Sequence, residues 1–180
     1  MRASGGAFGD FPDLPSRVVI GYEDLACGLR AMEVYRRSVE AVVGGCEAKI
    51  WKFEPLGIPD VFAEASRDIV EADVVIVSIA GDRPLPFEAV QWLDWCGKER
   101  TNPDGALLFV IDPAHELEAA ASLACEFLQR IAKRANLQFF APPACVHEVQ
   151  SPGDVAGFHN SIVGEAVLHS SRHECWGLNE

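Results

Sequence analysis

The sequence predicts a three-layer α/β fold, in which helices cover both faces of a parallel five-stranded sheet. The first observation is the stretch 73–81, Asp-Val-Val-Ile-Val-Ser-Ile-Ala-Gly, a β-branched apolar run between an acidic residue and a glycine. A strand that is apolar on both faces must be covered on both faces, as in the middle of a parallel sheet. The second observation is that short apolar runs alternate along the whole chain with segments of helical periodicity. This alternation is typical of α/β folds.

The first strand is expected at 17–22, followed by the acidic pair Glu23-Asp24. A helix with Asp24 as its N-cap should come next, since apolar residues then recur every three or four positions. Its predicted inward stripe is Leu25, Leu29, Met32, Tyr35, Val39 and Val42, and the pair Gly44-Gly45 should end it. The second strand is expected at 48–53, where two lysines among the apolar residues are typical of a sheet edge.

Pro59 is placed for the first turn of a second helix, which leads into the central strand. A third helix is expected to begin near Pro86 and to end before Gly97. The next strand is predicted at 106–111, and the last at 137–141. The inward stripes predicted for the second helix and for the long helix between these two strands are Ile58, Phe62, Ala65 and Ile69, and Leu117, Ala121, Ala124, Leu128, Ile131 and Ala135.

Crossovers between parallel strands are right-handed, and the simplest packing of these elements is a doubly wound sheet in the flavodoxin-like order 2-1-3-4-5. The α/β domain is expected to span residues 17–150. Residues 1–16 hold Gly, Ser, Pro and Asp without a sustained apolar run, so we expect a flexible arm and no signal peptide. Residues 151–180 should form a C-terminal segment, in which 158–169 supply a covering helix that precedes a tail.

The net charge of the chain restricts the classes of partner that it can bind. The chain of 180 residues carries 15 Lys and Arg against 27 Asp and Glu, a net charge of -12. Phosphate backbones and anionic lipids would be repelled, so we expect neither nucleic acid nor a membrane surface as a partner. No run approaches the roughly 20 apolar residues that a membrane span requires.

The spacing of the six cysteines indicates the redox environment of the protein. They lie far apart, without a Cys-x-x-Cys pair, and several fall on the apolar stripes of expected helices. We interpret them as small buried hydrophobic residues in a reducing environment, and we expect a cytoplasmic protein. The residues are Cys27, Cys46, Cys96, Cys125, Cys145 and Cys175.

Ligands of open α/β sheets bind beyond the carboxyl ends of the strands, where the winding reverses. In the predicted order this point lies between the first and third strands. The candidate ligand-binding residues there are Tyr22, Glu23, Asp24, Ser78, Gly81 and Asp82. Clustered carboxylates of this kind, with Asp112 farther along the rim, suit Mg²⁺. The alternative is that Glu23 and Asp24 cap the first helix and complement its dipole.

Three residues suggest a catalytic alternative. Ser78, Asp112 and His147 follow the third, fourth and fifth strands in the chain order of α/β-hydrolase triads, so they are candidate catalytic residues. However, Ser78 lacks the Gly-x-Ser-x-Gly elbow that would expose its oxygen, and it fits equally well as a small residue at a strand end. A small hydrolase or transferase with its site in the crevice between the first and third strands is therefore the second functional hypothesis.

No cofactor is predicted, although Mg²⁺ is compatible with the acidic cluster. The turn 22–28 is neither a dinucleotide loop nor a Walker loop, and it lacks the Ser/Thr-rich phosphate loop of flavodoxins. No metal site is predicted either. His169, His173 and Cys175 have a spacing that could hold zinc, with His159 nearby, but isolated histidines of a tail are usually solvated.

Trp92 and Trp95 lie three residues apart on the expected third helix, so they flank one face. Either both rings complete the core, or at least one indole stays exposed. An exposed indole would anchor a protein partner or a second copy of the chain, since Trp is prominent among interface hot spots.

The element order and the acidic pair Glu23-Asp24 after the first strand resemble the receiver domain of bacterial two-component response regulators. The resemblance implies a phosphorylated aspartate at the end of the third strand, where this chain has Ser78. It implies a hydroxyl residue at Ile111-Asp112 and a lysine at Pro142-Pro143, and both are missing. Serine cannot take a phosphoryl group by the carboxylate route, and the phosphate would lack its cation. The resemblance therefore implies a pseudo-receiver, a non-catalytic signalling or binding module that acts through a protein partner or a homodimer.

Four other segments look like a family of small uncharacterised bacterial proteins, a resemblance that implies no function. The segments are 22–24 (Tyr-Glu-Asp), 50–53 (Ile-Trp-Lys-Phe), 92–95 (Trp-Leu-Asp-Trp) and the ending 176–180 (Trp-Gly-Leu-Asn-Glu).

Overall fold

The described residues form a parallel sheet of five strands. The computed structural model describes residues 17–40, 47–101 and 105–143. Every pairing in the sheet is parallel, and the strand order is β2-β1-β3-β4-β5. The strands are β1 (Arg17–Tyr22), β2 (Glu47–Lys52), β3 (Val74–Ile79), β4 (Ala106–Ile111) and β5 (Gln138–Phe140). The predicted α/β class and the flavodoxin-like order 2-1-3-4-5 are confirmed.

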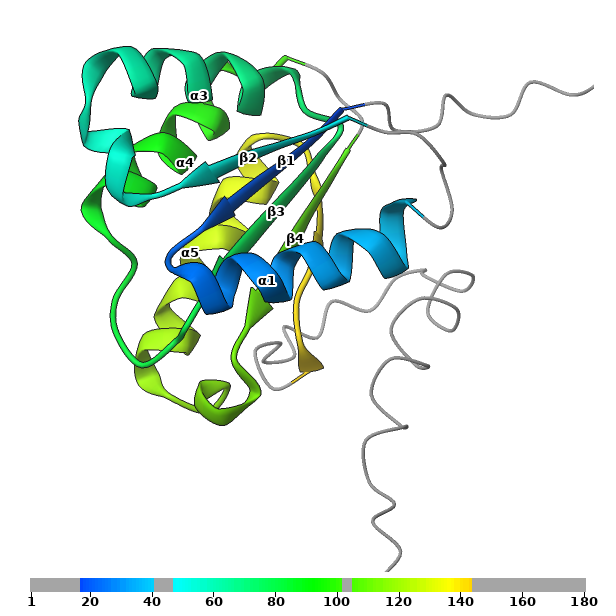
Figure 1. Ribbon diagram of the computed structural model, residues 1–180, viewed down its shortest axis with the longest axis vertical. Helices are drawn as coiled ribbons and strands as arrows, with labels where there is room; N and C mark the ends of the chain where they lie inside the picture. The colour runs from blue at the N-terminus through cyan, green and yellow to red at the C-terminus, as the bar shows by residue number, and fades with distance from the viewer. Residues whose placement is uncertain (1–16, 41–46, 102–104, 144–180) are drawn as a thin grey trace, which may run out of the picture. The chain divides into compact units, whose positions relative to one another are not determined.

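Helices lie on both faces of this sheet (Figure 1). One face carries α1 (Leu25–Val34), which continues as the π-helical segment η1 (Tyr35–Glu40). The opposite face carries α3 (Pro59–Glu71), α4 (Phe87–Glu99) and α5 (Ala119–Arg134). Two short 3₁₀ helices, η2 (Glu54–Gly57) and η3 (Pro113–His115), lie in the connections that follow β2 and β4.

Two expected regions, the arm 1–16 and the segment 151–180, lie outside the described residues. None of the helices that the structure describes is long and apolar enough to cross a membrane.

The central strand β3 is buried along its whole length. Val75, Val77 and Ile79 belong to the large hydrophobic cluster beneath α3, α4 and α5. Val74 and Ile76 belong to the smaller cluster beneath α1. Strict alternation between two apolar clusters explains why the sequence of this strand is apolar without interruption.

The inward face of α1 differs from the prediction. Leu25 and Leu29 were expected to face the sheet, but they are 75% and 65% exposed. The buried residues of the helix are Cys27 and Ala31. Their small side chains let the helix axis approach the strands closely. The positions of α1 that face the sheet therefore require small side chains, which cannot be recognised from the spacing of large apolar residues.

Two other helix boundaries also differ. Leu117 was expected inside the fourth predicted helix, but α5 begins two residues later and Leu117 is 87% exposed. Gly97 was expected to end the third predicted helix, yet α4 continues to Glu99. Gly97 is buried, and a Cβ there would lie 2.7 Å from Nε of Arg134, so its role is close packing against α5.

Gly21 of β1 makes room for the largest buried side chain. Trp92 of α4 is completely buried, and its ring lies 6.3 Å from that of Phe53 between centroids, at an interplanar angle of 57°. A Cβ at Gly21 would lie 2.6 Å from Cζ3 of Trp92 and 2.7 Å from Cε1 of Phe53. The two rings therefore occupy the volume that any side chain at this position would need.

We predict that Gly21→Ala lowers the free energy of unfolding by about 1–3 kcal/mol, because both rings must shift within a close-packed core. Urea unfolding followed by circular dichroism measures this change. Gly57→Ala is the matched control, since a Cβ there lies no closer than 3.7 Å to Glu88. Equal stability of the two variants would show that the core has free space beside Trp92.

Candidate functional site

The carboxyl ends of β1 and β3 lie side by side, as the strand order requires. Tyr22 is in register with Ser78, and the backbone N–H of Glu23 donates to the Ser78 carbonyl oxygen at 3.1 Å. The chain leaves β3 through Gly81, whose φ of 95° favours glycine. The structure thus brings the six candidate ligand-binding residues to one rim of the sheet, which we call the β1–β3 rim (Tyr22, Glu23, Asp24, Ser78, Gly81 and Asp82).

The carboxylate of Glu23 ties the two strand ends together. Its Oε2 accepts a hydrogen bond from the backbone N–H of Ala80 at 2.9 Å, and its Oε1 accepts one from Nε of Arg83. The side chain of Glu23 is only 6% exposed. Both oxygens are therefore used within the protein.

Arg83 is the cation of the β1–β3 rim. Besides its bond to Glu23, its guanidinium lies 3.6 Å from Oδ2 of Asp24 and 3.7 Å from Oδ1 of Asp82. The hydrogen bond to Glu23 raises the pKa of Arg83 above its ordinary value. Arg83 was not among the residues that the sequence analysis identified as candidates. The sequence signal that points to Arg83 is charge balance, because three neighbouring carboxylates are stabilised when a cation lies beside them.

Asp24 is the N-cap of α1, as the sequence predicts. Its Oδ1 accepts a hydrogen bond from the backbone N–H of Cys27 at 2.9 Å. This bond, together with the Cys27 thiol and with Arg83, holds the pKa of Asp24 below its ordinary value of 3.8. The interpretation of Asp24 as a helix cap is thus supported by geometry.

We predict that Asp24→Ala lowers the free energy of unfolding by about 1 kcal/mol at neutral pH, the usual cost of losing an N-cap. A carboxylate whose folded pKa is depressed stabilises above its unfolded pKa and loses that contribution as the pH falls through its folded pKa. The difference between wild type and Asp24→Ala should therefore shrink below pH 3.8. Asp24→Asn keeps the cap and is the control. Urea unfolding across this range tests both, and a difference that grows in acid would contradict the assignment.

Ser78 is inaccessible. The side chain has 0% exposure and lies on the α1 face of β3, in phase with Val74 and Ile76. Its Oγ has no hydrogen-bond partner among the residues that the structure describes. A nucleophile requires both access and a base, and the described surroundings of Ser78 supply neither.

Asp112 is bound to other groups. Its Oδ2 lies 2.5 Å from Nη2 of Arg30, and its Oδ1 accepts a hydrogen bond from the backbone N–H of Ala114 at 3.0 Å, which caps η3. No hydrogen bond joins Asp112 to Ser78, whose hydroxyl lacks any described partner. His147, the third candidate catalytic residue, lies outside the described residues.

We predict that Ser78→Ala raises the free energy of unfolding by about 1 kcal/mol, because it removes a buried hydroxyl that has no partner among the described residues. Ser122→Ala, where an exposed hydroxyl bonds to the Glu118 carbonyl, should change stability little. Chemical denaturation measures both. A loss of stability in Ser78→Ala would mean that the hydroxyl has a partner, such as a buried water.

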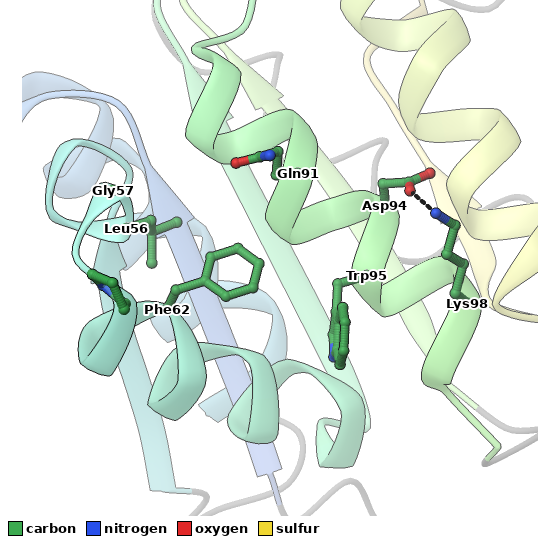
Figure 2. Close-up of a pocket in the computed structure, with 8 residues that line it drawn as sticks. Leu56, Gly57, Phe62, Gln91, Asp94, Trp95 and Lys98 are labelled. Atoms are coloured by element: carbon green, nitrogen blue, oxygen red, sulfur yellow. Dashed lines mark ion pairs between the residues drawn. The ribbon is translucent and has the colours of Figure 1, made fainter.

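The two candidate partner-surface tryptophans have different environments. Trp92 is fully buried and cannot contact a partner, which corrects that part of the prediction. Trp95 is 44% exposed and meets the edge of Phe62 at 6.4 Å between ring centroids. Figure 2 shows Phe62 of α3 and Trp95 of α4 beside a hollow between the two helices. Of the two indoles, Trp95 is therefore the one available to a partner.

The described cysteines are buried and free of disulfides, as expected for Cys27, Cys96 and Cys125. Burial raises the pKa of Cys27, and it raises the pKa of Cys96 to about 11, so both thiols are protonated and unreactive. The other three cysteines and the tail histidines lie outside the described residues. Within residues 17–40, 47–101 and 105–143, no three His, Cys, Asp or Glu side chains gather closely enough to hold one metal ion.

Comparisons with known proteins concern the fold only. No family model matches this chain, and no curated protein matches its sequence. The Trp repressor binding protein from Bacillus subtilis is 10% identical, with a TM-score of 0.43 over 69% of this chain and 81% of that one. General stress protein 14 from Treponema denticola, solved in complex with FMN, is 17% identical, with a TM-score of 0.40 over 70% and 83%. Nothing about the site follows from likenesses this distant.

Proposed function

We propose that the protein is a receiver-like binding module that transfers no phosphoryl group and acts through a protein partner. The observation that carries this proposal is the position of Arg83, whose guanidinium faces the carboxylates of Glu23, Asp24 and Asp82. Because this cation belongs to the chain itself, the three carboxylates are paired within the protein.

The reacting groups of a receiver are also replaced. A carboxylate acceptor is needed for phosphoryl transfer by the aspartate route, and Ser78 offers only a buried hydroxyl at that position. Pro142-Pro143 stand where a lysine would meet the phosphate, and proline carries no charge. These substitutions support a role in binding and not in phosphoryl transfer.

The β1–β3 rim also disfavours phosphate-bearing cofactors. Anion sites at helix N-termini depend on free backbone N–H groups and on the positive end of the helix dipole. At α1 the N–H of Cys27 is bonded to Asp24, and the carboxylate of Glu23 stands beside it. A phosphate placed there would meet negative charge, which supports a function without FMN or a dinucleotide.

The hydrolase alternative receives no support from the described residues. The nucleophile it requires is buried, and the acid it requires is paired with Arg30. For a substrate to reach Ser78, the Arg30–Asp112 ion pair would have to break and α1 would have to move away from β3.

We predict that beryllofluoride with Mg²⁺ leaves the amide signals of Glu23, Asp24 and Ser78 unchanged in ¹⁵N–¹H NMR spectra, because the acceptor position holds the buried Ser78 and not a carboxylate. Arg83→Ala should behave differently with Mg²⁺ alone. Without the guanidinium its carboxylates are no longer neutralised and should attract Mg²⁺ loosely from solution, whereas the wild type should not respond.

Mg²⁺ without beryllofluoride is the control for nonspecific binding to an acidic protein. Specific shifts of the wild-type β1–β3 rim by beryllofluoride would reject the proposed function, since they would reveal a working acceptor. A wild-type response to Mg²⁺ equal to that of Arg83→Ala would remove the role assigned to Arg83.

A further inference from the structure

The helix α1 has an apolar outer side. It covers the face of the sheet opposite α3, α4 and α5 (Figure 1). Leu25 and Leu29 of this helix are 75% and 65% exposed. Each lies two residues from Cys27, which is buried, and two residues turn an α-helix by about 200°. Both leucines therefore point away from the sheet, so a further helix in the same layer would leave them exposed.

Met32 continues this apolar side toward the end of α1. It is partly buried against the smaller hydrophobic cluster and lies three residues after Leu29. Leu25, Leu29 and Met32 thus follow one another at intervals of four and then three residues. These are the intervals at which one helix packs along another. We call these three residues the α1 ridge.

The beginning of α1 is acidic. Glu23, Asp24 and Asp82 of the β1–β3 rim share one guanidinium, that of Arg83. The side chains of Asp24 and Asp82 are 45% and 44% exposed, at 3.6 and 3.7 Å from this guanidinium. Both carboxylates therefore have oxygen atoms that face solvent, where a side chain of another molecule can meet them.

The other end of α1 is basic. Arg36 and Arg37 follow the helix in η1, and Arg37 pairs with Glu33 at 2.5 Å. Arg36 is exposed and has no ion pair with another described residue. The two ends of the α1 ridge therefore carry opposite charge, and the basic end holds a guanidinium that is free to pair.

The α1 ridge itself adds little to the negative charge of the chain. A chain with a net charge of -12 repels its own copies over much of its surface. Within α1, however, Arg30 pairs with Asp112 at 2.5 Å, and Glu33 pairs with Arg37. Two copies that meet along this helix therefore bring no unpaired carboxylates together at the centre of the contact.

We propose that the α1 ridge is the contact surface of a homodimer in which the two α1 helices pack antiparallel. Two-fold symmetry then sets Leu29 of one copy beside Met32 of the other. The same symmetry sets the basic end of each helix beside the acidic end of its partner, so Arg36 faces Asp24 and Asp82 across the contact. A parallel pair would instead bring like charges together.

The proposal goes beyond the proposed function, because it names a second copy of the chain as one binding partner and α1 as the surface. A contact through one helix of each copy is small, below about 1,200 Å² of total buried area, and interfaces of that size are weak. The dimer is therefore expected to depend on protein concentration.

Sedimentation velocity of the full chain from about 5 to about 500 µM should show a shift from monomer to dimer. Leu29→Gln should weaken dimerisation about tenfold or more, because each dimer buries this side chain twice. Leu123→Gln is the matched control, since Leu123 is a leucine of α5 with 63% exposure, and it should dimerise like the wild type. Circular dichroism verifies that both variants are folded.

A charge reversal tests the antiparallel arrangement. Arg36→Glu should weaken the dimer several-fold at low salt, because it places a carboxylate beside Asp24 and Asp82 of the other copy, and high salt should reduce the difference. Arg67→Glu is the matched control. Arg67 is an exposed arginine of α3 without an ion pair to another described residue, so this variant changes the net charge equally and should leave the dimer intact.

Three outcomes would overturn the proposal. The wild type could remain a monomer at every concentration, Leu29→Gln could dimerise as well as Leu123→Gln, or Trp95→Ala could abolish a dimer that Leu29→Gln retains, which would place the contact between α3 and α4. None of these outcomes bears on the beryllofluoride experiment, which decides the proposed function separately.

Discussion

The burial of β3 on both faces is the constraint on which the rest of the structure depends. Its alternating side chains enter two hydrophobic clusters, so helices must cover both sides of the sheet. With β1 and β4 as its neighbours, the carboxyl end of β3 lies beside that of β1. The same arrangement seats Trp92 of α4 over β1, where Gly21 leaves it room. The β1–β3 rim and the packing of α4 against the sheet therefore both follow from the placement of one strand.

The carboxylates of the β1–β3 rim repel one another, and a cation of the same chain compensates for their charge. Glu23, Asp24 and Asp82 are brought close together by strand pairing and by the turn after β3. Like charges in a partly buried setting cost free energy unless a cation compensates for them. Arg83 lies on the same turn, so it supplies that cation at little cost in chain entropy. The acidic residues of the rim are consequently paired within the protein and have structural roles. Glu23 links the ends of β1 and β3, Asp24 caps α1, and Asp82 is an ion-pair partner of Arg83.

The sequence predicts the fold well and the site only in part, and particular residues show why. The uninterrupted apolar run of β3 and the regular alternation of elements suffice for the sheet and its order, because periodicity and right-handed crossovers leave few other solutions. The same periodicity fails for α1, where Cys27 and Ala31 face the sheet and Leu25 does not, since closeness of packing depends on the neighbouring element. The location of the β1–β3 rim could be predicted from topology. Charge balance was the only sequence signal for Arg83, and it does not say which carboxylates Arg83 contacts, because an ion pair depends on side-chain geometry across two loops.

The two surfaces differ in what binding would cost. A ligand at the β1–β3 rim must first displace hydrogen bonds between charged groups, each worth about 1.5–3 kcal/mol, and then face the remaining carboxylates. Contact with Trp95, which is 44% exposed beside the hollow between α3 and α4, requires only that water leave the indole. Binding at Trp95 would therefore cost less free energy than binding at the strand ends, where α/β folds usually bind their ligands.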